Sequence, residues 1–211
     1  MKKFILILFI ITLNFANAKD ITILFLGDSL TEGLGVNKEQ AYPSLVEEKI
    51  KTSLKKDINV IKVINGGVSG STTSDALARL KWYMKRNPDY VFVALGANDG
   101  LRGLDLTQSQ INLEEIVQTA QNAKSKVLLA GMLIPPNYGP QYSEQFKNMF
   151  KNVKEKYNLK FMPFLLLDVA GVEEFNQRDG IHPNVEGHKV IAKNVYEFLE
   201  DILKKEINAT N

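Results

Sequence analysis

The chain has 211 residues, which is enough for one domain with a sizeable hydrophobic core and too few for two ordinary domains. Hydrophobic residues make up 45% of it and charged residues 24%, as in ordinary globular proteins. The formal net charge is only +2, and there are no cysteines, which excludes disulfides, a thiol nucleophile and lipidation at an N-terminal cysteine.

The start of the chain has the pattern of a secretory signal peptide. Two lysines precede a short, mostly apolar run from Phe4 to Leu13, and Ala16-Asn17-Ala18 follows as an A-x-A cleavage site. The run is shorter than the roughly 20 apolar residues that cross a bilayer, which favours a cleaved signal over a membrane anchor. We therefore expect a signal peptide over 1–18, a single mature domain over 19–211, and a periplasmic or secreted bacterial protein without a stable membrane anchor. Loss of the two lysines leaves basic and acidic residues in equal number, and no basic stripe indicates a nucleic-acid partner.

The mature chain begins with alternating strand and helix signals. Ile21–Gly27 is a short apolar run that ends at glycine, which predicts a buried strand. Residues 40–56 have apolar side chains at nearly helical spacing and predict a helix. A second strand is expected over 58–64, before the break at Asn65-Gly66-Gly67. A helix over 73–86 follows, and its candidate core residues are Leu77, Leu80, Trp82 and Met84.

The same alternation continues to the end of the chain. The remaining expected elements are, in order, a strand over 90–95, a helix over 107–123, a strand over 126–132, a helix over 143–157, a short strand over 161–164 and a closing helix over 184–203. Such alternation predicts parallel strands joined by right-handed crossovers, with helices on both faces. The expected fold is an α/β, three-layer, flavodoxin-like sandwich with a central parallel sheet of about five strands.

Polar and small residues follow the strands. In open parallel sheets the functional groups gather at the carboxyl ends of the strands. Gly27-Asp28-Ser29-Leu30 follows the first strand, 65–70 (NGGVSG) the second and Gly96-Ala97-Asn98-Asp99 the third, while a late loop carries Asp179-Gly180-Ile181-His182-Pro183. One serine, several backbone amides, one asparagine and an Asp/His pair are therefore expected at one edge of the sheet.

These residue types suit the cleavage of an ester. A serine hydroxyl needs a histidine to take its proton, a carboxylate to orient that histidine, and donors that stabilise the oxyanion. The sequence has only two histidines. His182 follows Asp179 by three residues, whereas His188 has no comparable partner and is expected to be a surface or half-buried residue of the closing helix. Taken singly, each polar residue equally fits a helix cap, a turn or a surface pair.

Together, the three blocks resemble the SGNH (GDSL) hydrolases. The chain has that family's G-D-S-L, G-x-N-D and D-x-x-H-P blocks in the family's order. Within the family it is most similar to the periplasmic thioesterase I/lysophospholipase/arylesterase branch, through 76–80 (ALARL), 96–103 (GANDGLRG) and 137–139 (NYG). The resemblance covers essentially the whole mature chain.

The resemblance implies a role for each position. Ser29 would be the nucleophile, His182 the base and Asp179 its orienter, while the oxyanion donors would be the backbone amides of Ser29 and Gly70 and the side chain of Asn98. Asp28 is expected to shape the turn around Ser29. The implied substrates are small acyl esters or thioesters, with lysophospholipids among them, and neither a cofactor nor a metal is implied.

Four other functions are weighed against this one. An SGNH enzyme that removes acetyl groups from a glycan would share the triad and differ in its substrate cleft. A binding module that has kept the fold would not need an intact triad and oxyanion asparagine. A flavodoxin-like phosphate-binding protein would need a phosphate loop after the first strand, and GDSLTEG is a poor one. A metal enzyme is disfavoured because two histidines and no cysteines leave only carboxylates as further ligands.

Overall fold

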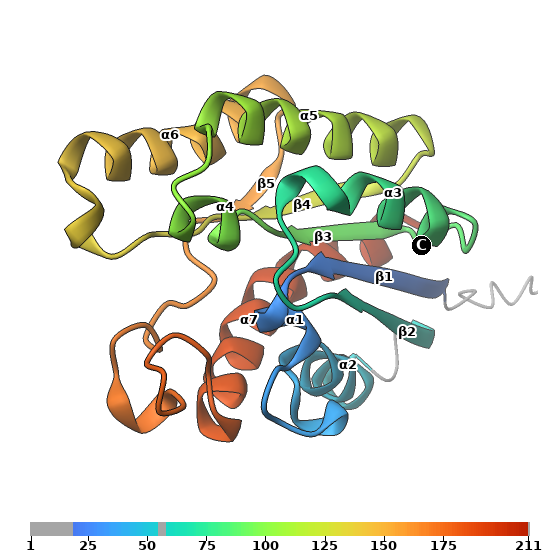
Figure 1. Ribbon diagram of the computed structural model, residues 1–211. Helices are drawn as coiled ribbons and strands as arrows, with labels where there is room; N and C mark the ends of the chain where they lie inside the picture. Colours follow the sequence, from blue (N-terminus) through green and yellow to red (C-terminus); the bar gives the residue numbers. More distant parts are fainter. Residues whose placement is uncertain (1–18, 55–57, 211) are drawn as a thin grey trace, which may run out of the picture.

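A computed structural model of the chain describes residues 19–54 and 58–210 (Figure 1). The expected signal peptide, residues 1–18, lies outside the described residues. Within those ranges, no helix is both long and apolar enough to cross a membrane.

The centre of the molecule is a five-stranded parallel sheet. Its strands are β1 (Lys19–Gly27), β2 (Ile58–Gly67), β3 (Tyr90–Ala94), β4 (Lys126–Ala130) and β5 (Lys160–Met162). They lie side by side in the order β2-β1-β3-β4-β5. All five residues of β3 are buried, as expected for a strand covered by helices on both faces.

Two layers of helices cover this sheet, as Figure 1 shows. One face carries α2 (Tyr42–Ser53) and α7 (Val185–Thr210), which pack against each other. The other face carries α3 (Thr73–Met84), α5 (Leu106–Asn122) and α6 (Pro140–Lys156). The expected three-layer α/β fold with a parallel sheet of about five strands is therefore confirmed.

Several short elements were not expected from the sequence. The helices α1 (Ser29–Glu32) and α4 (Ala97–Leu101) follow β1 and β3 directly. Each is too short to show an apolar period of 3.6 residues. Single 3₁₀ turns lie in the connecting segments, at η1 (Lys38–Gln40), η2 (Pro136–Tyr138) and η3 (Glu173–Phe175).

One expected core residue of α3 is on the surface. The buried side of this helix is formed by Thr73, Ala76 and Leu80, which are three and four residues apart. Leu77 and Met84 are only partly buried. Trp82 is 52% exposed, and the Arg86 guanidinium carbon stacks over it, 4.0 Å from the centre of the Trp82 ring. The ring of Trp82 therefore lies on the surface of α3, and the prediction that Trp82 is a core residue was wrong.

The strand order brings the ends of β1, β2 and β3 together. Gly27, the last residue of β1, is in register with Gly67 on one side and with Ala94 on the other. The chain moves outward from β1 to β2 and then crosses over to β3, so the order of the strands reverses beside β1. Ligands of open α/β sheets bind outside the carboxyl ends of the strands at such a reversal.

Candidate active site

Ser29 is the first residue of α1 and directly follows the N-cap Asp28. Oδ1 of Asp28 accepts a hydrogen bond of 3.0 Å from the backbone N–H of Leu30, so Asp28 shapes this turn, as the sequence suggested. The backbone N–H of Ser29 lies at the start of the helix and has no acceptor among the residues that the structure describes.

The structure brings Ser29, His182 and Asp179 together in a hydrogen-bonded row. Ser29 Oγ lies 3.0 Å from His182 Nε2, and His182 Nδ1 lies 2.7 Å from Asp179 Oδ2. A carboxylate can only accept hydrogen bonds, so Nδ1 of the imidazole donates to Asp179. In the neutral imidazole Nε2 is then an acceptor, and the Ser29 hydroxyl donates to it.

A closed turn holds the Asp/His pair in this arrangement. Oδ1 of Asp179 accepts the backbone N–H groups of Ile181 and His182, both at 3.0 Å. Gly180, which follows Asp179 directly, has a φ of +73°. The hydrogen bond from the His182 backbone N–H, followed by the one from its side chain, lowers the pKa of Asp179 from 3.8 to about 2. Asp179 is therefore ionised over the whole physiological pH range and can stabilise a protonated His182.

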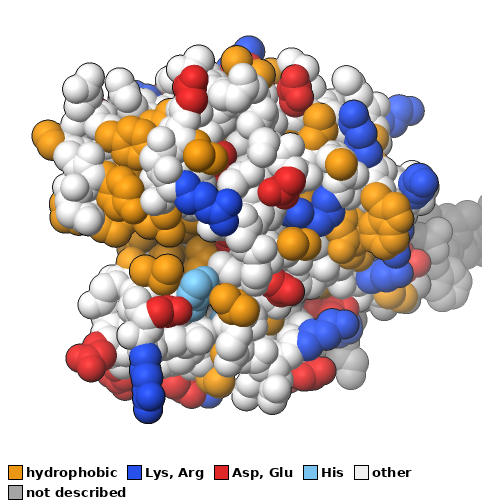
Figure 2. Space-filling view, in the orientation of Figure 1, with side chains coloured by type: hydrophobic (Ala, Val, Ile, Leu, Met, Phe, Trp, Pro, Cys, Tyr) orange, Lys and Arg blue, Asp and Glu red, His pale blue; other side chains and the backbone are white. Residues whose placement is uncertain are grey.

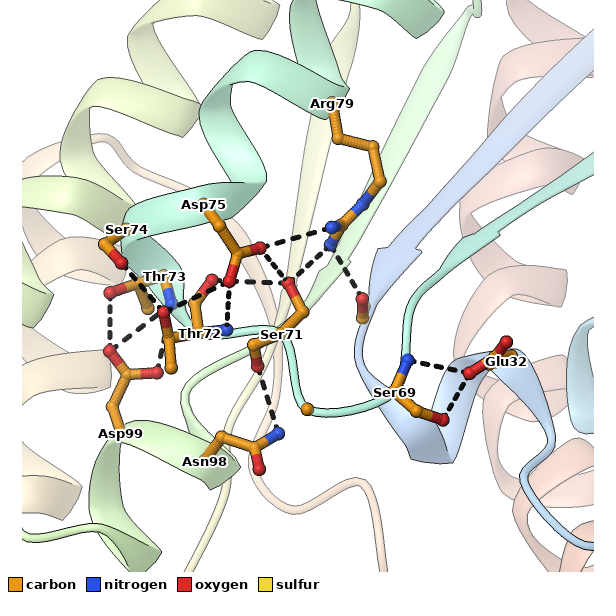
Figure 3. Close-up of polar contacts among 12 residues, drawn as sticks. Glu32, Ser69, Ser71, Thr72, Thr73, Ser74, Asp75, Arg79, Asn98 and Asp99 are labelled. Carbon is orange, nitrogen blue, oxygen red and sulfur yellow. Dashed lines mark hydrogen bonds and ion pairs between the residues drawn. The ribbon is translucent and has the colours of Figure 1, made fainter.

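The loop after β2 connects the two other expected site residues. Gly70 has a φ of +75°, a conformation that favours glycine, and its N–H has no acceptor among the described residues. The Asn98 side chain donates from Nδ2 to the Ser71 carbonyl oxygen at 3.0 Å (Figure 3). Nη2 of Arg102 donates to the Gly70 carbonyl at 2.9 Å and lies 3.4 Å from Asn98 Oδ1. Gly70 and Asn98 are thus linked through Ser71 and Arg102.

A buried carboxylate fixes α4, and with it Asn98, against α3. Asp99 is 1% exposed and accepts hydrogen bonds from the backbone N–H of Thr73 at 3.0 Å and from its hydroxyl at 2.6 Å. The hydroxyl of Ser109 donates to the same carboxylate at 2.9 Å. These contacts satisfy a buried charge and assign Asp99 a structural role.

His188 is more buried than we expected. It is 1% exposed, and its Nδ1 accepts the backbone N–H of Tyr42 at 3.3 Å, at the start of α2. Burial lowers its pKa from 6.5 to about 4, so it is neutral at physiological pH. The expectation of a surface or half-buried side chain was wrong because the last helix packs against α2 along this face.

The surface around His182 is apolar. The imidazole visible in Figure 2 belongs to the partly buried His182, since His188 is buried, and hydrophobic side chains gather on both sides of it. Among the described residues, no three His, Asp or Glu side chains form a group that could hold a metal ion. The arrangement can activate a hydroxyl next to an apolar surface, which suits attack on an acyl group.

Comparison with known proteins decides the family. Residues 25–190 match the GDSL-like Lipase/Acylhydrolase family. The chain belongs to this family. The match begins inside β1, just before the GDSL block, and extends into α7, so it includes Ser29, Asn98 and His182.

Proteins named as esterases and as a thioesterase are similar to most of the chain. Esterase TesA of Pseudomonas aeruginosa is 36% identical over 86% of this chain and 89% of its own. The Escherichia coli protein "Thioesterase 1/protease 1/lysophospholipase L1" is 33% identical over 88% of this chain and 86% of its own. The crystal structure of the psychrotrophic esterase EstA from Pseudoalteromonas sp., inhibited by monoethylphosphonate, is 36% identical, with a TM-score of 0.81 over 87% of this chain and 98% of that one.

These similarities establish the class of enzyme. The chain is a carboxylic ester hydrolase of the GDSL type. Sequence reasoning did not identify the partly buried Arg79 of α3 or the two polar links through Ser71 and Arg102. The sequence did contain a sign of the role of Arg79. It follows the buried Ala76 by three residues and directly precedes the buried Leu80, and a charged side chain on that side of a helix needs a polar partner.

Proposed function

We propose that this hydrolase is a serine esterase and thioesterase that cleaves acyl esters through Ser29, His182 and Asp179 and an acyl-enzyme intermediate. The observation that carries the proposal is the row of two hydrogen bonds, 3.0 Å and 2.7 Å long, that joins Ser29 to His182 and His182 to Asp179. His182 is therefore close enough to take the proton of the Ser29 hydroxyl, and the Asp179 carboxylate fixes the orientation of the His182 ring.

In the first half of the reaction, Ser29 Oγ attacks the acyl carbon while His182 Nε2 takes the hydroxyl proton. The tetrahedral intermediate collapses when the bond to the leaving alcohol or thiol breaks, and His182 returns the proton to that leaving group. Water then attacks the acyl-enzyme and gives a proton to His182. The bond from the acyl carbon to Ser29 Oγ breaks, His182 returns the proton to Oγ, and the carboxylic acid is released. Asp179 stays ionised throughout, which stabilises the imidazolium of His182.

The oxyanion would be stabilised by three donors. The backbone N–H groups of Ser29 and Gly70 have no acceptor among the described residues and are therefore free to donate. Asn98 uses one hydrogen of its amide on Ser71 and keeps the other. Donors that are fixed before the reaction act without reorganisation when charge develops on the substrate oxygen.

The proposed substrates are aryl esters, acyl-CoA thioesters and lysophospholipids. The names of the E. coli and Pseudomonas relatives support this range, because they include an esterase, a thioesterase and a lysophospholipase. The apolar surface around His182 suits an acyl chain. We place the enzyme in the periplasm or outside the cell because of the signal-like pattern over 1–18.

Labelling with a fluorophosphonate tests the nucleophile. The wild type and Ser143→Ala should both be labelled, because the buried Ser143 hydroxyl has no hydrogen-bond partner in the described structure and its removal costs little. Ser29→Ala should not be labelled, and His182→Ala should be labelled far more slowly. Labelling of Ser29→Ala at the wild-type rate would refute the proposed nucleophile.

A substrate panel tests the proposed range. It contains nitrophenyl esters of increasing chain length, acyl-CoA thioesters, a lysophospholipid and an acetylated glycan, with Ser29→Ala as the background control. Hydrolysis of the acyl esters and thioesters is expected. Turnover confined to the acetylated glycan would instead make the chain a carbohydrate esterase.

A further inference from the structure

The side chain of Arg79 lies between the strand that leads to Ser29 and the loop that carries Gly70 (Figure 3). It comes from α3 and is 15% exposed. Its Nη2 donates to the Gly27 carbonyl oxygen at 2.9 Å and to the Ser71 hydroxyl at 2.8 Å, and its Nη1 donates to Asp75 at 3.3 Å. One guanidinium group therefore contacts two segments that are far apart in the sequence.

Both contacts lie close to atoms of the proposed reaction. Gly27 precedes Ser29 by two residues, and its carbonyl oxygen accepts the N–H of Val68 from the loop at 3.2 Å as well. Ser71 directly follows Gly70, and its own carbonyl oxygen accepts the side-chain amide of Asn98 at 3.0 Å. Arg79 thus joins the backbone of the nucleophile to both of the other proposed oxyanion donors.

Polar contacts rather than core packing hold this loop in place. Val68, Ser69 and Gly70 are all exposed, so core packing does not fix their position. On the side of α1, the carboxylate of Glu32 accepts hydrogen bonds from the backbone and the hydroxyl of Ser69. On the side of α3, the hydroxyl of Ser71 is held between Arg79 and Asp75. Arg102, which donates to the Gly70 carbonyl, and Asn98, which donates to the Ser71 carbonyl, add contacts from α4, so polar groups of α1, α3 and α4 fix the loop.

The stability of the fold does not explain why position 79 carries a charged side chain. Its Nε is buried without a hydrogen-bond partner among the described residues, and its salt bridge with Asp75 is long, at 3.3 Å. The Asp75 side chain is 51% exposed, and salt bridges with a solvent-exposed partner contribute little to stability. A methionine could fill this space, but only a guanidinium offers donors to a carbonyl and a hydroxyl from one rigid plane.

We propose that Arg79 is a positioning residue that fixes the Gly70 amide and the Asn98 side chain relative to Ser29. This inference rests on the proposed function, because it requires Ser29 as nucleophile and Gly70 and Asn98 as oxyanion donors. Arg79 does not touch the substrate. It acts through Gly27 and Ser71, and it sets the oxyanion donors at the distance from Ser29 that the tetrahedral intermediate needs.

The test is a comparison of Arg79→Met with Arg86→Met. Both variants lose one positive charge from the same region, but Arg86 lies beyond the end of α3 and stacks on the exposed Trp82. For Arg79→Met we expect kcat to fall about 10- to 100-fold, because a small misplacement of reacting groups has an effect of this size. KM should stay within twofold of the wild type, and the melting temperature should not change. The inhibition constant of an aryl boronic acid, which mimics the tetrahedral intermediate, should rise by the same factor. Arg86→Met should match the wild type.

Two further variants separate the geometry of Arg79 from its charge. Arg79→Lys keeps the charge without the planar fork, so it should recover only a small part of the lost kcat. In Arg79→Ala, millimolar methylguanidinium should raise kcat, whereas potassium chloride at equal ionic strength should not. The same additions should have no effect on Arg86→Ala.

Three results would overturn the inference. The first is a folded Arg79→Met protein with the wild-type kcat. The second is an Arg79→Met protein in which KM rises while kcat is unchanged. The third is a decrease in kcat that is proportional to the unfolded fraction of the variant. Fluorophosphonate labelling and ester hydrolysis by the wild type are measured beside these variants. If the wild type shows neither, the proposed function fails; if it shows both while Arg79→Met is normal, only the role of Arg79 fails.

Discussion

The carboxyl group of Asp28 is buried next to the proposed nucleophile. It is 1% exposed, its Oδ1 caps α1, and its Oδ2 has no hydrogen-bond partner among the described residues. Burial raises the pKa of Asp28 from 3.8 to about 6, although the Leu30 N–H and the nearby His182 act in the opposite direction. At neutral pH the folded protein therefore holds a buried, mostly ionised carboxylate that destabilises it.

The variant Asp28→Asn should become more stable relative to the wild type as the pH rises. The pKa of Asp28 is higher in the folded state than in the unfolded state, so its stabilising contribution is complete below pH 3.8 and is lost as the pH passes 6. Asparagine does not titrate, so the difference in free energy of unfolding between the variant and the wild type should grow by about 2 kcal/mol from pH 4 to pH 8. Urea denaturation at both pH values measures it, and a difference that stays constant would contradict the proposed titration.

Single residues also mark the limit of what sequence could predict. The blocks around Ser29, Asn98 and His182 were visible because their residue types and order are distinctive. The burial of His188 and the contacts of Arg79 were not, because both depend on which helix faces which neighbour. A polar residue within a helix pattern gives no sign of its partner when that partner is a backbone group of another element, such as the Gly27 carbonyl for Arg79 or the Tyr42 N–H for His188.

At the scale of elements, α1 can follow β1 so tightly because two glycines leave room for it. A Cβ atom on Gly27 would lie 2.0 Å from the Thr31 hydroxyl oxygen, and one on Gly67, at the end of β2, would lie 2.1 Å from the Glu32 backbone nitrogen. No side chain fits at either distance. The helix that carries Ser29 therefore rests directly on the backbone of the neighbouring strand.

Gly67→Ala should displace α1 and lower both stability and kcat. The added methyl group meets backbone atoms, which cannot rotate away, so we expect a loss of about 1–3 kcal/mol in the free energy of unfolding. Gly171→Asn is the matched control, because Gly171 has a positive φ of 75° and open space around it, and asparagine tolerates that conformation. Urea denaturation and kcat on a nitrophenyl ester measure the outcome. Wild-type values of both in Gly67→Ala would show that α1 does not depend on this contact.

The long elements were predictable and the short ones were not. Strands buried on both faces are continuously apolar, so β1, β3 and β4 stand out from their surroundings. The helices α1 and α4 have four and five residues, fewer than two turns, so neither is long enough to show a helical period in the sequence. These two helices carry Ser29 and Asn98, so the elements that hold the site were the least visible ones.

At the scale of the whole molecule, the site combines residues from opposite ends of the chain. Ser29 and His182 are 153 positions apart and still within hydrogen-bond distance. From the sequence, the late loop with Asp179 and His182 was predicted at the same edge of the sheet as the ends of the strands. That position follows from the packing of α7 against α2, which places the segment before α7 next to α1.

Export should produce a mature enzyme that begins at Lys19. Cleavage after Ala18 leaves the whole of β1 intact, because Lys19 is its first residue. N-terminal sequencing of protein recovered from the periplasm or the medium should read KDITIL. A version in which Met directly precedes Lys19 is the control and should stay in the cytoplasm. Recovery of the full chain only as an intact Met1 form in the cytoplasm would contradict the expected signal.

The two ends of the described chain lie at the edge of the sheet opposite Ser29. Lys19 begins β1, and Glu206 near the end of α7 pairs with Lys126, the first residue of β4 (Figure 1). A tether fixed to either end would therefore hold the molecule with its catalytic edge turned outward. Enzyme immobilised on a bead through either end would keep its catalytic groups open to solution, whereas attachment through the loop of 179–183 would press them against the support.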